Sequence, residues 1–289
     1  MTARLATSDL VLRATPGPTV LRFSRGLWAG AMCLGIVLVA ALLSLVWTPY
    51  PPDALDLPNR LSGPSAEHWL GTDAFGRDVA ARLLEGARNA LWVGVLAVAL
   101  GVVLGGALGL LAAAGFRWLD ESIARAADLL FAFPAVLTAI LLTIVLGPGL
   151  FTATLAIGIF NVAVFARLVR SAAGVVWAQE FVRAAEALGR TRARITLAHV
   201  VPNVLGLVLV QASASFAIAI LAEAALSYLG LGIQAPAASW GRMLFEARTY
   251  LDQAPLLAIF PGLAIALAVF GANLLGDALR DGLDPRGNP

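Results

Sequence analysis

Six long runs of apolar residues alternate with polar segments along the chain. The runs cover residues 27–47, 90–114, 129–146, 150–169, 204–226 and 256–275. Each is close to the roughly 20 residues that an α-helix needs to cross the hydrocarbon core of a bilayer. Lipid offers no partner to an open backbone, and the runs are too long for the strands of a membrane barrel. The pattern therefore predicts an all-α integral membrane protein with six transmembrane helices.

The composition agrees with this prediction and excludes several kinds of catalytic site. Hydrophobic residues make up 60% of the chain and charged residues 13%, against about 25% charged in soluble proteins. All 20 basic residues are arginine, so the chain lacks the lysine that a P-loop places on nucleotide phosphates. A Schiff-base enzyme is excluded for the same reason, because it needs a lysine amine. Neither a P-loop nor a Schiff-base site can therefore be built from this chain, and we expect ATP to be hydrolysed on another polypeptide.

Metal, disulfide and nucleic-acid chemistry are not predicted either. The single cysteine, Cys33, lies in the first apolar run, and His68 and His199 lie far apart in different polar segments. A disulfide within the chain needs two cysteines, and a metal centre needs a cluster of ligands. The formal charge of +2 is small, and the chain has no basic stripe with interleaved aromatic residues that would indicate nucleic-acid binding. We expect no cofactor.

The distribution of arginine predicts which ends of the helices face the cytoplasm. With the N-terminus inside, fourteen arginines fall in cytoplasmic segments and six in outside segments. Because basic residues favour the cytoplasmic side, we predict an N-in, C-in topology. Residues 1–26 are then a cytoplasmic tail, residues 27–289 form one six-helix domain, and the loop at 172–202 lies in the cytoplasm.

One compact charged segment interrupts the apolar runs at residues 180–203. Its first part places Glu180, Arg183 and Glu186 on one face, the pattern of a surface helix. Glu186 and Arg190 have the order and spacing of a favourable i, i+4 ion pair. The apolar face of this predicted helix comprises Phe181, Val182, Ala184, Ala185 and Leu188.

A turn and a second helix are predicted to follow. Gly189 supplies the flexible position at which a helix commonly ends, and Thr191 is a suitable N-cap for a short helix over residues 191–199. Pro202 then begins the next span, where its missing N–H does no harm. Two interpretations stay open at this point. The segment is either a surface loop held to lipid headgroups by arginine, or a rigid element that docks in the groove of a partner protein.

The spans contain small residues and a proline that bear on packing. Gly101, Gly105 and Gly109 lie at i, i+4 and i+8, which lets two helix backbones approach closely in lipid. We expect contact within the chain, with contact between subunits as the alternative. Pro134 removes a backbone donor and predicts a bend in the third span, either a structural kink or a hinge.

Few polar groups lie inside the spans. Glu223 is the only carboxylate well inside an apolar run, and it should face protein or water rather than lipid. We predict that it lies near the outer boundary, either as a hydrogen-bonded structural acid or as part of a transport path or outer gate. Asn161 and Gln211 either line that path or form hydrogen bonds between helices, and the second interpretation is favoured.

Two outside segments, residues 49–88 and 230–255, are long enough to have structure of their own. The first begins TPYPP, which is too rich in proline to continue a helix. Val79, Leu83 and Leu84 then recur at helical spacing, which predicts an interfacial helix that leads into the second span. Neither segment is expected to form a folded domain.

Four stretches carry a resemblance to a known family. EFVRAAEALGRTRARITLAHVVPN, at 180–203, resembles the EAA loop of the permeases of binding-protein-dependent ABC importers. Three further stretches are similar to permeases of the dipeptide, oligopeptide and nickel branch: HWLGTDAFGRD at 68–78, LAEAALSYLGLGIQAPAASWG at 221–241 and NLLGDALRDGLDPR at 273–286. The resemblance covers residues 50–286, and four motifs in order form a more specific signal than any single one.

The resemblance implies an architecture, partners and a cargo. It implies the type I ABC importer permease fold in the bacterial cytoplasmic (inner) membrane. It also implies a second homologous permease subunit, usually a different chain, together with two ABC ATPase subunits inside and a periplasmic or lipid-anchored solute-binding protein outside. The implied cargo is a dipeptide or oligopeptide, with nickel, metal chelates and glutathione as alternatives.

The resemblance also implies that the segment after residue 179 couples the permease to the ATPase subunits. Gly189 would form the turn between two coupling helices, and Ala184, Ala185 and Leu188 the docking edge. Arg183, Glu186 and Arg190 would make the polar contacts around it. The full set of implied coupling residues is Glu180, Arg183, Ala184, Ala185, Glu186, Leu188, Gly189, Arg190, Arg194 and His199.

One departure from the family pattern concerns charge. Where the family usually has the glutamate of the EAA tripeptide, this chain has Arg183, and where a base often follows three positions later it has Glu186. An i, i+3 pair can form in either order, but a contact between the family's acid and a base on its partner would not carry over.

Two other classes of protein fit the sequence less well. An ion-coupled secondary transporter often shows repeated halves and ion ligands at the midplane, and the sequence has neither a half-to-half repeat nor a mid-span charge besides Glu223. An intramembrane hydrolase needs a nucleophile and a base close together in the membrane. Both histidines lie outside the predicted spans, which argues against that class.

Overall fold

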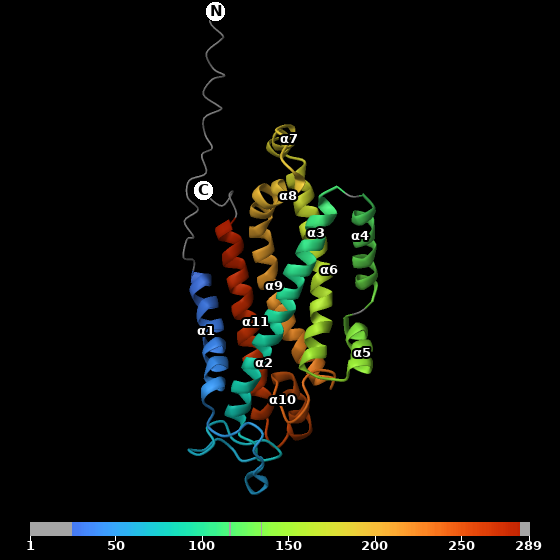
Figure 1. Cartoon of the computed structure of the whole chain (residues 1–289). Helices are drawn as coiled ribbons and strands as arrows, with labels where there is room; N and C mark the ends of the chain where they lie inside the picture. Colours follow the sequence, from blue (N-terminus) through green and yellow to red (C-terminus); the bar gives the residue numbers. More distant parts are fainter. Residues whose placement is uncertain (1–24, 116, 134, 284–289) are drawn as a thin grey trace, which may run out of the picture.

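The computed structural model describes residues 25–115, 117–133 and 135–283, which form a bundle of helices (Figure 1). In chain order these are α1 (Arg25–Val46), α2 (Val79–Leu100), α3 (Gly106–Ala113), α4 (Arg117–Ala132), α5 (Ala135–Leu146), α6 (Leu150–Trp177), α7 (Glu180–Ala187), α8 (Arg192–Ile195), α9 (Val201–Tyr228), α10 (Trp240–Ala247) and α11 (Leu256–Leu283). Two π-helical segments, Gly101–Gly105 and Thr196–Val200, join α2 to α3 and α8 to α9 without a break. Short 3₁₀ turns lie at Leu57–Asn59 and Arg248–Tyr250.

Five helical runs are long and apolar enough to cross a membrane. These are Gly26–Val46, Val79–Ala113, Leu150–Trp177, Arg192–Tyr228 and Leu256–Leu283. The pair α4 and α5, which bends by 92°, makes a sixth if it is one broken span. The apolar run at 129–146, predicted as one bent span, is divided in the structure between the end of α4 and α5, on either side of this bend. The first turns of α4 carry charged residues, so the apolar run did not include them. Pro134, where the bend was predicted, lies outside the described residues.

Several helices are longer than the apolar runs that predicted them. α2 begins at Val79 rather than residue 90, and α6 ends at Trp177 rather than residue 169. The interfacial helix predicted around Val79 is instead the buried first part of α2. Val79 is 0% exposed, and the Asp78 carboxylate caps the helix by accepting a hydrogen bond from the N–H of Ala81 at 2.7 Å. Charged residues in these end turns pair within the protein, so the helix continues where the apolar pattern stops.

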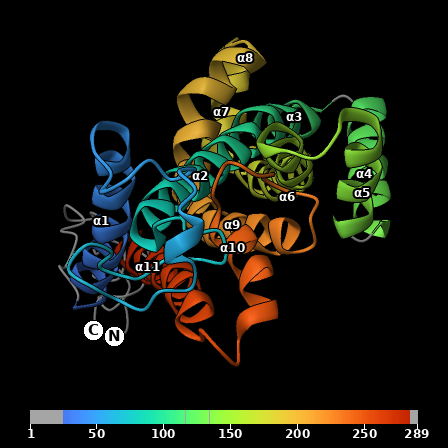
Figure 2. The same ribbon diagram turned by 90° about the horizontal axis from the view of Figure 1, so that it is seen from below.

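α6 forms the centre of the bundle. It is the most deeply buried candidate span in the described part of the chain, and it contacts α2, α3, α4, α5 and α9. α11 contacts both α1 and α9 on the other side of the bundle (Figure 2). The start of α1, the end of α11 and the pair α7–α8 all lie at one end of the bundle, and α10 lies at the other (Figure 1). We refer to these as the α7 end and the α10 end.

The glycines of the second span face α6. A Cβ atom added at Gly101 would lie 2.7 Å from the Cβ of Asn161, and one added at Gly109 would lie 2.7 Å from the carbonyl oxygen of Ala166. One added at Gly105 would overlap the carbonyl oxygen of Val162. The backbones of the two helices are therefore too close for any side chain at these positions, and the contact lies within this chain.

Gly109→Ala is expected to lower the midpoint of thermal unfolding of the detergent-solubilised protein. The added methyl group meets backbone atoms of α6, and overpacking of this kind costs about 1–3 kcal/mol. Gly106→Ala is the matched control, because a Cβ there meets nothing within 4 Å. Alanine favours helix over glycine by up to about 1 kcal/mol, so this control should be neutral or stabilising. Equal midpoints for both variants would contradict the close approach of α3 to α6.

Candidate functional site

Two short helices, α7 and α8, project from one end of the bundle (Figure 1). Gly189 forms the turn between them with a φ of +78°, in the left-handed region that favours glycine. Its N–H donates to the carbonyl of Glu186 at 2.9 Å, and the N–H of Arg190 donates to the carbonyl of Ala185 at 3.2 Å. These bonds close the end of α7, and the order of helix, turn and helix is the one that the sequence predicted.

The apolar side chains of α7 point in two directions. Val182 and Ala185 are buried against Ile195 of α8 and against Val176 and Trp177 at the end of α6. Phe181 and Leu188 are 48% and 81% exposed, and Ala184 is exposed as well. The prediction that Ala185 belongs to an exposed docking edge was therefore wrong, because its face of α7 packs on the protein itself. The apolar surface left for a partner consists of Phe181, Ala184 and Leu188, which we call the apolar tip.

The charges around the apolar tip pair differently from the prediction. The carboxylate of Glu186 lies 4.0 Å from Nε of Arg192, not beside Arg190. Arg190 instead places its Nη1 3.4 Å from Nε2 of His199, because the chain leaves the helical path at Gly189. Glu180, Arg183 and Arg194 are exposed. Thr191 occupies the N-cap of α8, although its side chain makes no capping hydrogen bond with the residues that the structure describes.

Arg192 links this projection to α3, a contact that the sequence analysis missed. Its Nη1 donates to the carbonyl oxygen of Ala114, directly after the last turn of α3. The guanidinium also lies 5.9 Å from the centroid of the Trp177 ring. Residues 114 and 192 are far apart in the sequence, so no periodic pattern could have indicated the contact.

The second of the two predicted short helices does not end before the next span. α8, the π-helical segment Thr196–Val200 and α9 form one continuous run from Arg192 to Tyr228, 37 residues long. The predicted start of a separate helix at Pro202 was therefore wrong, because proline is tolerated in the first turn of α9 without a break in the path. α8 and α9 are therefore parts of one continuous helical run.

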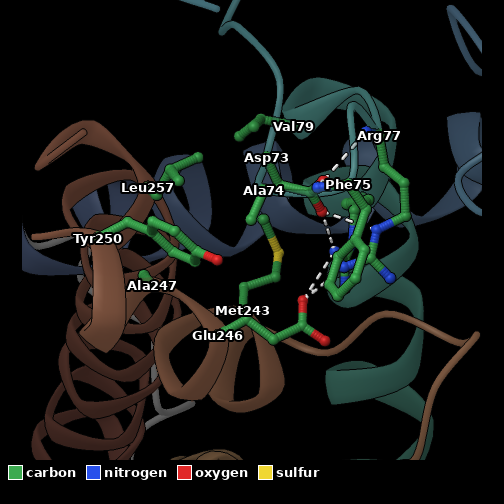
Figure 3. Close-up of a pocket in the computed structure, with 11 residues that line it drawn as sticks. Asp73, Ala74, Phe75, Arg77, Val79, Met243, Glu246, Ala247, Tyr250 and Leu257 are labelled. Atoms are coloured by element: carbon green, nitrogen blue, oxygen red, sulfur yellow. Dashed lines mark hydrogen bonds and ion pairs between the residues drawn. The ribbon is translucent and has the colours of Figure 1, made fainter. Parts of the chain in front are cut away.

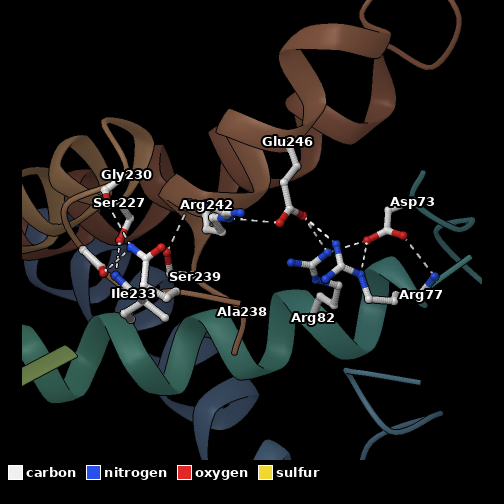
Figure 4. Close-up of polar contacts among 12 residues, drawn as sticks. Asp73, Arg77, Arg82, Ser227, Gly230, Ile233, Ala238, Ser239, Arg242 and Glu246 are labelled. Atoms are coloured by element: carbon white, nitrogen blue, oxygen red, sulfur yellow. Dashed lines mark hydrogen bonds and ion pairs between the residues drawn. The ribbon is translucent and has the colours of Figure 1, made fainter. Parts of the chain in front are cut away.

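A cluster of buried charges lies at the α10 end (Figure 4). Arg77 donates from Nε to Asp73 at 2.7 Å and from Nη2 to Glu246 at 2.7 Å. Arg82 donates from Nη1 to Glu246 at 2.9 Å and also to Asp73, and Arg242 donates to Glu246 at 3.0 Å. These side chains are 2–19% exposed. These ion pairs hold the loop before α2 against α10.

The cavity beside this cluster is small (Figure 3). Phe75, Met243 and Tyr250 are among the residues that line it, and its volume is about 20 Å³, which is enough for one water molecule. A peptide does not fit. The cluster and its cavity are therefore part of the framework at this end of the bundle rather than a solute site.

Glu223 is buried at the end of α9, with an exposed fraction of 0%. The hydroxyl of Ser227 donates to its Oε1 at 2.6 Å, and the same hydroxyl accepts from the N–H of Ile233 at 3.0 Å (Figure 4). The other oxygen, Oε2, has no hydrogen-bond partner among the residues that the structure describes. Glu223 therefore belongs to a polar group that holds the loop after α9.

The other two polar residues predicted inside the spans lie elsewhere. Asn161 is buried in α6 against Gly101, and Gln211 is half-buried in α9, where it donates to the Ser215 hydroxyl at 3.2 Å. Gln211 and Glu223 are about 18 Å apart along the helix. The structure thus does not bring Glu223, Asn161 and Gln211 together into one site.

The sequence of this chain is similar to those of known transport proteins. Residues 105–288 match the family described as the inner membrane component of binding-protein-dependent transport systems. The chain is 49% identical to the dipeptide transport system permease protein DppC of Alkalihalophilus pseudofirmus, over 79% of this chain and 75% of that protein. It is 40% identical to the glutathione transport system permease protein GsiD of Pectobacterium atrosepticum, over 89% of this chain and 87% of that protein.

A solved structure of the MetNI methionine ABC transporter, described as inward facing, contains a chain of similar fold. The TM-score is 0.59 at 17% sequence identity, and the match covers 70% of this chain and 96% of that one. At this identity the likeness concerns the fold alone.

Proposed function

This chain belongs to the inner membrane components of binding-protein-dependent transport systems, the permease subunits of ABC importers, and we propose from this premise that it imports short peptides as one of two transmembrane subunits. The second subunit is a homologous chain that completes the path across the bacterial cytoplasmic membrane. The remaining partners are two ABC ATPase subunits inside and a periplasmic or lipid-anchored solute-binding protein outside. In this arrangement the α7 end faces the cytoplasm, with both termini and the loop at 172–202 on that side.

The observation that carries the proposal is the projecting pair α7 and α8 with its apolar tip. Phe181, Ala184 and Leu188 are all exposed on this projection among exposed charged residues, and an apolar patch rimmed by polar groups marks a candidate surface for a partner. The pair is rigid, because Gly189 closes the turn and Val182 and Ile195 pack beneath it. It is also continuous with a spanning helix. A docking element that a partner can grip and that passes movement into the membrane has these properties.

The transport mechanism assigns no covalent chemistry to this chain. ATP binding and hydrolysis take place on the partner subunits, whose closure displaces α7 and α8. The spans then exchange between a state open to the cytoplasm and a state open to the outside. Energy enters through the contact at the apolar tip, so uptake against a gradient requires ATP and the ATPase subunits.

The proposed cargo rests on the named relatives. DppC is named for dipeptides and GsiD for glutathione, which is itself a short peptide. A short peptide is the chemistry that the two names share, and glutathione is the second candidate because that relative aligns with 89% of this chain.

Reconstitution of the whole importer tests the proposal. Proteoliposomes that contain this chain, the second permease and the ATPase subunits should accumulate a labelled dipeptide when ATP is inside and the solute-binding protein is outside. Omission of the ATPase subunits should abolish accumulation. Uptake that a proton or sodium gradient sustains after ATP is depleted would instead indicate a secondary transporter.

Glu223→Gln is expected to keep uptake within about threefold of the wild-type rate. The amide oxygen of glutamine can still accept the bond from Ser227, and one neutral hydrogen bond contributes about 0.5–1.5 kcal/mol. The measurement is the rate of dipeptide uptake by the reconstituted complex. Complete loss of uptake with all subunits still bound would contradict the structural role and would place Glu223 on the transport path.

A further inference from the structure

Arg192 joins the ends of three helices at the α7 end of the bundle. It belongs to α8, it donates a hydrogen bond to the carbonyl of Ala114 at the end of α3, and its guanidinium lies over Trp177 at the end of α6. Its contact with Glu186 is longer, at 4.0 Å, and both side chains there are well exposed, so that ion pair contributes little. The bond to α3 and the contact with the indole ring therefore define what Arg192 does.

The bond to Ala114 is favourable on physical grounds. The last carbonyl groups of a helix lack N–H partners within it and carry the negative end of the helix dipole, so a cation there is stabilising. The chain also leaves room for the contact. Gly115 follows with a φ of +100°, and a Cβ atom on it would overlap the guanidinium of Arg192. Glycine is favoured at 115 by its positive φ, and the absence of a side chain there leaves space for the guanidinium of Arg192.

Resting on the proposed function, we propose that Arg192 is a positioning residue that makes α3 move together with α9 when the ATPase subunits displace α7 and α8. α9 is driven because it is continuous with α8. α3 is driven through Arg192, and α3 is itself continuous with α2. The first turns of α2 carry Arg82 of the charge cluster at the α10 end. A displacement of α7 and α8 therefore reaches both long helical runs, α2–α3 and α8–α9. Through them it reaches both sides of the charge cluster at the α10 end.

Arg192→Ala in the reconstituted complex tests this inference. The ATPase subunits should still co-purify and hydrolyse ATP, because the apolar tip is intact, but the amount of dipeptide imported per ATP should fall about tenfold, within the usual range of coupling between two sites. Arg192→Lys should recover part of this ratio, since an amine can donate to the carbonyl of Ala114. Arg280→Ala removes an exposed arginine from α11 at the same end and should leave the ratio unchanged.

Spin labels on α3 and α8 give a second measurement. Leu111 and Ala193 are exposed and can carry the labels after replacement by cysteine in a Cys33→Ala background. Their separation should stay constant through the ATP cycle in the presence of Arg192 and should vary with nucleotide in the Arg192→Ala variant.

Two outcomes would overturn the positioning role. One is an Arg192→Ala variant that imports with the wild-type ratio and keeps a constant label separation. The other is loss of the ATPase subunits from this variant, which would make Arg192 a docking residue. If the unmodified chain itself fails to bind the ATPase subunits, the proposed function fails rather than this inference.

Discussion

Substitution of Leu188 by aspartate is expected to detach the ATPase subunits and abolish uptake, while the protein still folds and enters the membrane. Leu188 is 81% exposed, so its replacement removes no packing from the protein itself. Burial of a leucine in a partner's groove stabilises the complex by about 1.5–3 kcal/mol, and burial of an unpaired carboxylate adds a further cost. The affinity for the ATPase subunit should therefore fall by about 100-fold or more, as measured by co-purification and titration.

Two further variants sharpen this experiment. Leu283→Asp places the same charge at the end of α11, at the same end of the bundle but away from the apolar tip, and it should retain the ATPase subunits. Gly189→Pro should behave like Leu188→Asp, because proline fixes φ near −65° and the turn requires +78°. Normal ATPase binding by both Leu188→Asp and Gly189→Pro would count against docking at this element.

Glu246→Gln is expected to be strongly destabilising. Glu246 accepts hydrogen bonds from Arg77, Arg82 and Arg242, and its side chain is only 16% exposed. Without its charge, the buried guanidinium groups of Arg77 and Arg82 keep only Asp73 as an ionised partner, and Arg242 loses its ion pair. The removal of one partner from a buried ion pair costs about 3–5 kcal/mol. The midpoint of thermal unfolding in lipid nanodiscs should drop accordingly.

The matched control for this prediction is Asp252→Asn. Asp252 is an exposed acid that lies shortly after α10, and neutralisation of an exposed acid usually changes stability by less than about 0.5 kcal/mol. If the two variants unfold at the same temperature, the charge cluster does not hold the loop before α2 to α10 as described.

The spans were predictable because the bilayer imposes a length and a composition on every helix that crosses it. Their ends were not. α2 starts eleven residues before the apolar run at residue 90, and its first turns carry Arg82, which pairs with Glu246 of α10. The apolar pattern reports exposure to lipid, and it cannot distinguish a charged residue in a loop from one that is buried in a helix and paired.

The projecting pair α7 and α8 was predictable in outline and not in detail. Amphipathic spacing and Gly189 were sufficient to place two short helices and a turn. Ala185 faces inward because Val176 and Trp177 of α6 lie beneath α7. That arrangement is set by tertiary packing, which local sequence patterns do not report. The charge cluster was beyond prediction for the same reason, because Arg82 and Glu246 are separated by 164 positions in the sequence.

The unbroken run from Arg192 to Tyr228 has a consequence for signalling in both directions. At about 1.5 Å per residue, its 37 residues reach roughly 55 Å, more than the hydrocarbon thickness of a bilayer. Under the proposed function, we expect a displacement at one end of this continuous helix to shift its other end as well. In that arrangement, a loaded solute-binding protein at one end and nucleotide-bound ATPase subunits at the other would bias the same displacement, and each would favour or oppose the other by an equal free energy.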